Sequence, residues 1–233
     1  MKHILIALFL TALSFQVAAV ERKTAAQINP DELIAETQQD VSQSRDHIAF
    51  VWYIPSEYWT AGSNADTRLP GEEQEQIQQT MANLTVIAIV QGDYPPIGPV
   101  RYYDRNYLLK TVRFFRVDAE GERHPLQPYQ SVTRPVRMLI GSIAPALGTT
   151  IGSLGDNLQF FVFNDQTLDR KRLMDPGLPG GLIVELTGKE GRSLQAEFEF
   201  PLNSLYVPRK CPNGKPAHIS WRYCPWTGKK LPE

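Results

Sequence analysis

The chain has 233 residues, two cysteines and a formal net charge of −1. This length suits one sizeable domain with a small appendage, and the ordinary apolar content excludes a chain without a core. Basic and acidic residues are unevenly placed, with 4 against 11 in residues 20–83 and 6 against 1 in residues 202–233. A basic tail of this kind can dock on the chain's own acidic segment or attract an anionic partner.

Residues 1–19 have the pattern of a signal peptide. Met1-Lys2-His3 is a short basic start, residues 4–15 are mainly apolar, and Val17-Ala18-Ala19 supplies the small residues that a signal peptidase requires. We expect cleavage after Ala19, which makes the protein periplasmic or secreted, with no stable membrane insertion. The alternative is a retained anchor, but an anchor needs roughly 20 apolar residues and this run is shorter.

Residues 20–46 are predicted to hold a leader and an N-terminal helix. The segment 21–27 is polar and has no period, so we expect it to be flexible. Asn29 can cap a helix, Pro30 fits its first position, and the acidic residues that follow complement the positive end of its dipole. The helix is expected to run to about Ser44.

Residues 47–207 are predicted to form the main domain. Its first strand is the apolar, β-branched run 48–54, which Pro55 ends. An aromatic turn is expected at 55–59, followed by a polar loop at 60–68. Further along the chain, the pattern predicts a helix over 70–83 and strands over 84–90, 107–117 and 158–163.

Glu57 has the most site-like surroundings in this domain, because Trp52, Tyr58 and Trp59 flank it. A carboxylate among aromatic rings can be desolvated and can then act as the acid in hydrolysis of a glycan or peptide. That chemistry needs a second carboxylate within about 10 Å. Aromatic faces beside an acid can also hold a sugar or a cation. The alternative is structural, with the rings filling the core while backbone N–H groups bind the carboxylate.

An uncharged stretch, residues 138–155, begins inside a helix predicted over 134–147. Gly148 and Gly152 have the small-xxx-small spacing of helix pairs in lipid, which raises the alternative of membrane association through this stretch. Pro145 and four glycines oppose that interpretation. We therefore expect a buried helix and loop.

A hairpin is predicted from residues 182–187 and 193–200. Leu194, Ala196 and Phe198 alternate with polar residues, so one face is buried and the other is wet. Helices are inserted among the strands and do not alternate strictly with them. The predicted fold class is therefore α+β, with a mainly antiparallel sheet or sandwich, inserted helices and a small C-terminal tail.

Residues 208–233 resemble a zinc ribbon that has lost one cysteine from each of its two Cys-x-x-Cys turns. Cys211 and Cys224 remain, and Gly214 and Thr227 stand where the second ligands would be. Two thiols cannot close a structural zinc site, so in an exported chain we expect a Cys211–Cys224 disulfide. Chain entropy gives a loop of this size about 3 kcal/mol of stabilisation. The alternative is a metal site of Cys211, His218 and Cys224; no cofactor is expected.

Two stretches carry a wider resemblance, Phe200-Pro201-Leu202-Asn203-Ser204-Leu205 and, in the tail, Tyr223-Cys224-Pro225-Trp226-Thr227-Gly228. They make the chain similar to a loose group of uncharacterised exported bacterial proteins, which join such a body to a C-terminal zinc-ribbon-like cap. The resemblance supplies no known activity.

The function expected from these patterns is that of an exported, non-catalytic binding or assembly module. Its tail, with Trp221, Tyr223, Trp226 and the lysines, is expected to contact a protein or an envelope polymer. Basic residues interleaved with aromatic ones also occur in nucleic-acid-binding proteins, but export argues against nucleic acid as the partner. The alternatives are a glycan or peptide hydrolase that uses Glu57, and a membrane-associated envelope protein that uses residues 138–155.

Overall fold

The computed structural model describes residues 20–66, 69–150 and 152–232, and for residues 143–150 and 152–153 it describes the backbone alone. The predicted signal peptide, residues 1–19, lies outside the described residues. The described chain is α+β with antiparallel sheets, as the sequence predicts.

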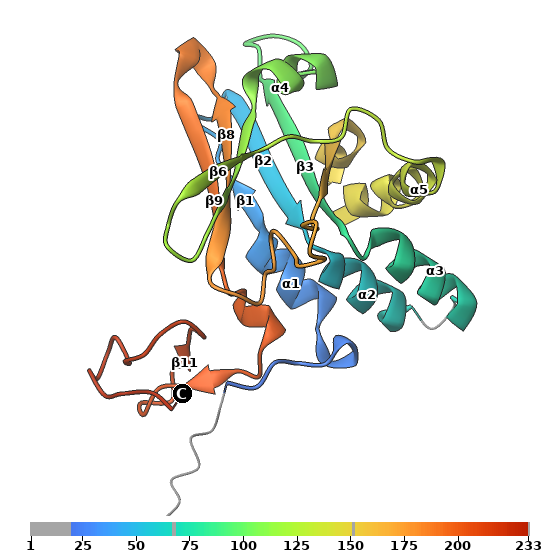
Figure 1. Ribbon diagram of the computed structural model, residues 1–233. Coiled ribbons are helices and arrows are strands. Elements are labelled where there is room, and N and C mark those ends of the chain that lie inside the picture. Colours follow the sequence, from blue (N-terminus) through green and yellow to red (C-terminus); the bar gives the residue numbers. More distant parts are fainter. Residues whose placement is uncertain (1–19, 67–68, 151, 233) are drawn as a thin grey trace, which may run out of the picture.

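Two antiparallel sheets face each other (Figure 1). In the first sheet, β3 is central, with β2 along one side and β4 and β7 along the other; β1 is beyond β2. Its strands are β1 (Gln38–Asp40), β2 (His47–Ile54), β3 (Leu84–Asp93), β4 (Arg101–Tyr102) and β7 (Gln159–Asn164). The second sheet has the order β6 (Arg123–Leu126), β5 (Arg113–Val117), β8 (Gly180–Thr187) and β9 (Ser193–Phe200).

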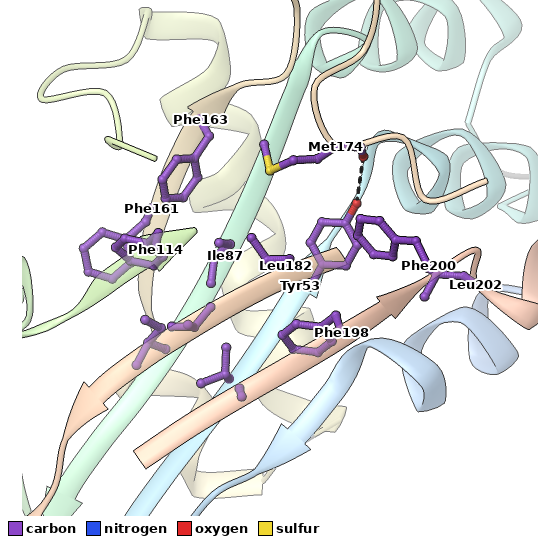
Figure 2. Close-up of a cluster of buried hydrophobic side chains, with 14 of the residues drawn as sticks. Tyr53, Ile87, Phe114, Phe161, Phe163, Met174, Leu182, Phe198, Phe200 and Leu202 are labelled. Carbon is purple, nitrogen blue, oxygen red and sulfur yellow. Dashed lines mark hydrogen bonds between the residues drawn. The ribbon is translucent and has the colours of Figure 1, made fainter. Parts of the chain in front are cut away.

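A hydrophobic core fills the space between the two sheets (Figure 2). Tyr53, Ile87 and Phe161 enter it from the first sheet and are fully buried. Phe114 and Phe198 enter it from the second sheet, and the Phe114 ring lies 5.4 Å from the Phe161 ring. The structure is therefore the predicted sandwich, with apolar residues of alternating strand positions meeting at its centre.

Helices cover the outer face of the first sheet (Figure 1). They are α2 (Ser56–Ala65), α3 (Gly71–Met81) and α5 (Arg134–Thr150). Trp52 and Ala88 on the sheet pack with Met81, Val136 and Ile140 on the helices. Strands β2 and β3 are thus buried on both faces, which explains why their sequences are continuously apolar and do not alternate.

The N-terminal segment is held to the body, so the flexible leader predicted at 21–27 is wrong. Arg22 pairs with Tyr206 in an antiparallel bridge, and the backbone N–H of Lys23 donates to the Leu205 carbonyl at 2.9 Å. Asn29 caps α1 (Pro30–Thr37), as predicted, by accepting from the Asp31 N–H at 2.9 Å. The helix ends at Thr37 and not near Ser44, because the next residues form β1 and pair with β2.

Two further segments differ from prediction. Residues 107–117 are not one strand, because Asp104 accepts from the Tyr107 N–H at 2.8 Å and caps α4 (Arg105–Thr111), which precedes β5. The expected turn and loop over 55–68 instead contain α2, which buries Trp59, Ala61 and Ser63. Its N-terminus has no side-chain cap, so packing against the sheet stabilises this helix more than local sequence does.

The remaining elements connect the sheets or lie in the tail. Residues 25–27 (η1), 152–157 (η2), 189–191 (η3) and 203–205 (η4) form short 3₁₀ helices. The tail pairs β10 (Arg209–Lys210) with β11 (Pro216–Ala217). Among helices of the described residues, none has the length and apolar content that crossing a membrane requires. In α5, Val136 and Ile140 pack inward while Met138 is exposed.

His47 at the start of β2 makes folding stability depend on pH. It is 2% exposed, and burial lowers its pKa from the ordinary 6.5. Its ring contacts Gln91 and the Gln43 N–H. Below about pH 6.5 the imidazole of His47 takes up a proton more readily in the unfolded chain than in the folded one. The free energy of unfolding should therefore fall as the pH falls. Urea unfolding at about pH 7.5 and about pH 5.5 measures the loss. In His47→Gln the fall in unfolding free energy between the two pH values should be smaller. An equal fall in both proteins would contradict the role of His47 in this pH dependence.

Candidate functional site

Glu57 lies in the first turn of α2, where its carboxylate faces two arginines. Arg172 Nη1 donates to Glu57 Oε1 at 2.5 Å, and Arg22 Nη2 donates to the same oxygen at 3.1 Å. Ser56 Oγ lies 3.3 Å from the other oxygen, Oε2. The Glu57 side chain is 11% exposed. Protein donors therefore occupy both oxygens of Glu57. The structural alternative expected backbone N–H donors, but the donors are the side chains of Arg172, Arg22 and Ser56.

The same arginines bind two more carboxylates. Arg172 donates to Asp165 Oδ2 through Nε at 2.9 Å and Nη2 at 2.8 Å, and the Asp165 side chain is fully buried. Arg22 Nη2 lies 3.6 Å from Asp175 Oδ1. Although burial acts to lower the pKa of Arg172, the charges of Glu57 and Asp165 outweigh it and raise that pKa. We call Arg22, Glu57, Asp165, Arg172 and Asp175 the arginine–carboxylate network.

Both neighbouring guanidinium groups bind Glu57 Oε1, and Ser56 Oγ lies beside Oε2. An acid catalyst must instead turn a carboxyl oxygen toward its substrate. Arg172 lies in the loop between β7 and β8 and donates hydrogen bonds to Asp165 in the same loop and to Glu57 in α2. These bonds hold the loop against α2. The geometry thus suits a structural ion-pair network better than a hydrolytic centre.

The aromatic residues around Glu57 lie in the helix–sheet core. Trp52 is fully buried and its Nε1 donates to Thr37 Oγ1 at 3.2 Å, while Trp59 is 4% exposed. Tyr58 packs edge-on against both, with ring centroids 5.6 Å from Trp52 and 5.5 Å from Trp59. Buried rings that cover one another leave no open face for a sugar or a cation.

The two turns of the tail are built alike. Gly214 N–H donates to the Cys211 carbonyl and Gly228 N–H donates to the Cys224 carbonyl, each at 2.8 Å. The N–H groups of Cys211 and Cys224 return to the carbonyls of Lys215 and Lys229, also at 2.8 Å. Both glycines have positive φ, 80° and 65°, which other residues adopt at a cost. Each cysteine of the tail therefore begins a turn that two backbone hydrogen bonds close, and the turn at Cys224 is one residue longer than the turn at Cys211.

Cys211 and Cys224 are buried in the same small core of the tail, and no disulfide joins them. Burial, together with the hydrogen bond to Cys224, raises the pKa of Cys211 to about 11. Burial acts in the same direction on Cys224, but hydrogen bonds from Cys211, Thr227 and the backbone of Trp226 and Thr227 outweigh it and lower its pKa to about 7. A thiolate beside a thiol is the pairing from which thiol oxidation begins.

The third metal-ligand candidate, His218, has other partners. Its Nδ1 lies 2.8 Å from Ser220 Oγ, and its ring packs near Trp221. Within the described parts of the chain, the residues that bring three ligand atoms within 4.8 Å of one another are Asp118, Glu122 and His124, in the β5–β6 turn. There Asp118 accepts the N–H groups of Glu120 and Glu122 and pairs with His124 at 2.6 Å, so these contacts stabilise the turn.

The tail presents aromatic and basic side chains to solvent. Tyr223 is 59% exposed and Trp226 is 47% exposed. Lys215 Nζ lies 4.9 Å above the Trp226 ring, and Trp221 packs edge-on against that ring at 5.6 Å. We call Lys215, Trp221, Tyr223 and Trp226 the tail surface.

The tail surface rests on an ordered base. Arg209 donates to the carbonyls of Ile219, Trp221 and Pro232, at 2.9, 3.3 and 2.7 Å. A small core of Cys211, Ala217, Cys224 and Leu231 lies beneath it. The tail is connected to the body through Asn203, whose Oδ1 accepts the Ile219 N–H at 3.0 Å and whose own N–H donates to Glu36. The Trp226 ring, which contacts Trp221 and Lys215, is therefore held in place before any partner binds.

The structure separates the residues that sequence analysis singled out into three places. Trp52, Tyr58 and Trp59 lie in the core, Glu57 lies in the arginine–carboxylate network, and the tail residues are on a surface of their own. Sequence analysis missed Arg22 and Arg172, because they lie 35 and 115 residues from Glu57 and no local pattern marks them. Comparison with protein-family models, curated proteins and solved structures finds no match to this chain.

Proposed function

We propose that the protein is an exported, non-catalytic binding or assembly module, and that its tail surface contacts a negatively charged partner, an acidic protein segment or an acidic envelope polymer. The observation that carries this proposal is the exposed Trp226 ring, held beside Lys215 and Trp221, together with the exposed Tyr223. Rigid aromatic rings contribute large contact areas at low entropic cost, and they dominate many binding surfaces.

Charge supports an anionic partner. Residues 202–233 include six basic residues and one acidic residue. Arg209 is used inside the tail, whereas Lys215 is exposed and lies over the Trp226 ring. Basic side chains around exposed rings attract polyanions over a distance and orient them on contact.

Tail binding predicts a measurable effect for Trp226→Ala. Binding of fluorescent polyglutamate, as an acidic peptide, and of polygalacturonate, as an acidic glycan, is measured by anisotropy on the mature protein. We expect at least one probe to bind, Trp226→Ala to weaken it about tenfold, and added salt to weaken it further. The matched control is Tyr94→Ala, which removes a ring with 42% exposure from the body. Failure of both probes to bind, or equal loss in both variants, contradicts the proposal.

Export and the Cys211–Cys224 disulfide belong to the same proposal. The two cysteines are buried in the same small core, so closing the bond needs little movement of the tail. Forming the bond releases two protons and passes two electrons to a thiol oxidant of the exported compartment. The bond would hold together a tail that has few buried residues of its own.

Intact mass of protein purified from its native compartment tests both parts. We expect the mass for cleavage after Ala19, less two hydrogens, with no thiol reactive to alkylation before reduction and two after it. Elemental analysis of the same sample should find no stoichiometric zinc. Two free thiols together with one zinc ion per chain would contradict the disulfide and favour the site of Cys211, His218 and Cys224.

A further inference from the structure

A hollow of about 390 Å³ lies between α4, α5 and the outer edge of β7. Two arginines line it, Arg105 at the start of α4 and Arg137 in the first turns of α5. Its other polar lining comes from Tyr129, Gln130 and Ser131, and its apolar lining includes Ile140 and Phe160. None of its lining residues is acidic, so the hollow is cationic and partly apolar.

Arg105 is half-buried without a carboxylate partner. Its Nη1 donates to the Phe160 carbonyl, and its guanidinium carbon lies 4.8 Å from the centre of the Phe161 ring. Burial lowers its pKa. Within the described residues, the ion pairs of the chain include Arg22, Arg113, Arg123, Arg172 and Arg192 but not Arg105. Even a half-buried cation loses part of its hydration when it has no counter-ion, and a bound anion would offset that loss.

Arg137 adds a second cation to the same hollow. Its Nη2 donates to the Val132 carbonyl at 3.2 Å, and none of the ion pairs among the described residues includes it. Each guanidinium carries five N–H donors, and one from each is used on a backbone carbonyl. Two arginines with free donors are well suited to a carboxylate or a phosphate.

Two further hollows, each lined by both apolar and polar residues, continue from the first along α5. A second hollow, of about 420 Å³, shares Tyr129, Ser131, Val132 and Val162 with the first and is also lined by Leu84 and Val136. A third, of about 520 Å³, shares Thr80 with the second. It lies between α3 and α5, beside Ile77, Leu139 and Met138, and its charged lining is Glu73 and Arg134. The first hollow is thus lined by two arginines and no acidic residue, whereas the α3–α5 groove is mainly apolar and has one residue of each charge in its lining.

We infer that this trough binds a small amphipathic anion. Its carboxylate or phosphate head would lie at Arg105 and Arg137, and its apolar chain would follow α5 toward the α3–α5 groove. The inference is independent of the tail surface, which lies on a different part of the molecule (Figure 1).

The competing explanation for Arg105 is purely structural. The outer edge of β7 leaves carbonyls unpaired, and Arg105 satisfies Phe160 while the Tyr129 N–H satisfies Val162 at 2.7 Å. An Arg105→Gln variant alone would therefore mix binding with loss of this contact. Arg137 is exposed and bonds a loop carbonyl, so Arg137→Gln is the cleaner test.

The test is calorimetric titration of the mature protein with decanoate, kept below its aggregation concentration. Decanol and inorganic phosphate serve as comparators that keep only the chain or only a charge. Decyl phosphate, the second head group, reports whether the site prefers a carboxylate or a phosphate. We expect decanoate or decyl phosphate to bind at least about tenfold more tightly than either comparator, and Arg137→Gln to weaken it about tenfold. Arg45→Gln is the charge-matched control, because Arg45 is an exposed arginine that lines none of the three hollows.

Amide chemical shifts locate the ligand. Shifts at Ser131 and Ile140 on titration support the trough, whereas shifts confined to the tail around Trp226 overturn it. The inference also fails if neither amphiphile binds, if inorganic phosphate binds as tightly as decanoate, or if Arg45→Gln weakens binding as much as Arg137→Gln. Thermal unfolding by circular dichroism confirms that both variants are folded, so loss of structure cannot imitate loss of binding.

Discussion

Replacing Arg172 with glutamine is expected to lower the free energy of unfolding by about 3–5 kcal/mol. The substitution removes the cation that Glu57 and Asp165 share, and the Asp165 side chain is fully buried. Asp165 keeps only the Met174 N–H, at 2.6 Å, as a donor among its present contacts. Without the cation, the buried Asp165 either keeps an uncompensated charge or takes up a proton. Either outcome lowers the free energy of unfolding.

Urea unfolding followed by tryptophan fluorescence measures this loss. The matched control is Arg192→Gln, because Arg192 pairs with Glu190 at 3.3 Å with both side chains well exposed, at 65% and 79%. An exposed pair of this kind contributes about 0–1 kcal/mol. If the two variants lose the same stability, the arginine–carboxylate network has no special structural role. That outcome would reopen the question of what Glu57 does.

Phe114→Ala is expected to cost about 3–5 kcal/mol, through the cavity that it leaves between the two sheets. Phe114 comes from β5 and packs against two rings of β7, Phe161 at 5.4 Å and Phe163 at 4.9 Å (Figure 2). Those neighbours lie on strands held by backbone pairing, so the core can collapse only partly into the space.

The control for this variant lies at the next position of the same strand. Phe115 points to the opposite face of β5 and is only partly buried, so Phe115→Ala should cost about 1 kcal/mol. Urea unfolding again measures both. A loss for Phe115→Ala as large as that for Phe114→Ala would mean that the strand register of β5 differs from the one described here.

Much of the fold follows from local patterns. The hairpin of β8 and β9 was predictable because the residues of β9 alternate with period two, and Ala196, Phe198 and Phe200 are the ones that become buried. Helix α3 and strand β3 were predictable from their own periodicity and composition. By contrast, α4 was missed, because the cap at Asp104 is a single contact and the residues after it are equally compatible with a strand.

Local patterns were enough to predict the fold class and the strands β2, β3, β7, β8 and β9, because periodicity and composition act over a few neighbouring residues. The short strands β1, β4 and β6 were not predicted. Tertiary structure alone decided what the candidate residues became. Trp52 and Trp59 are buried in the core, and Glu57 binds two arginines from distant parts of the chain. Arg105 and Arg137 line the same hollow. Such meetings depend on which surfaces pack together, and that is a property of the whole chain.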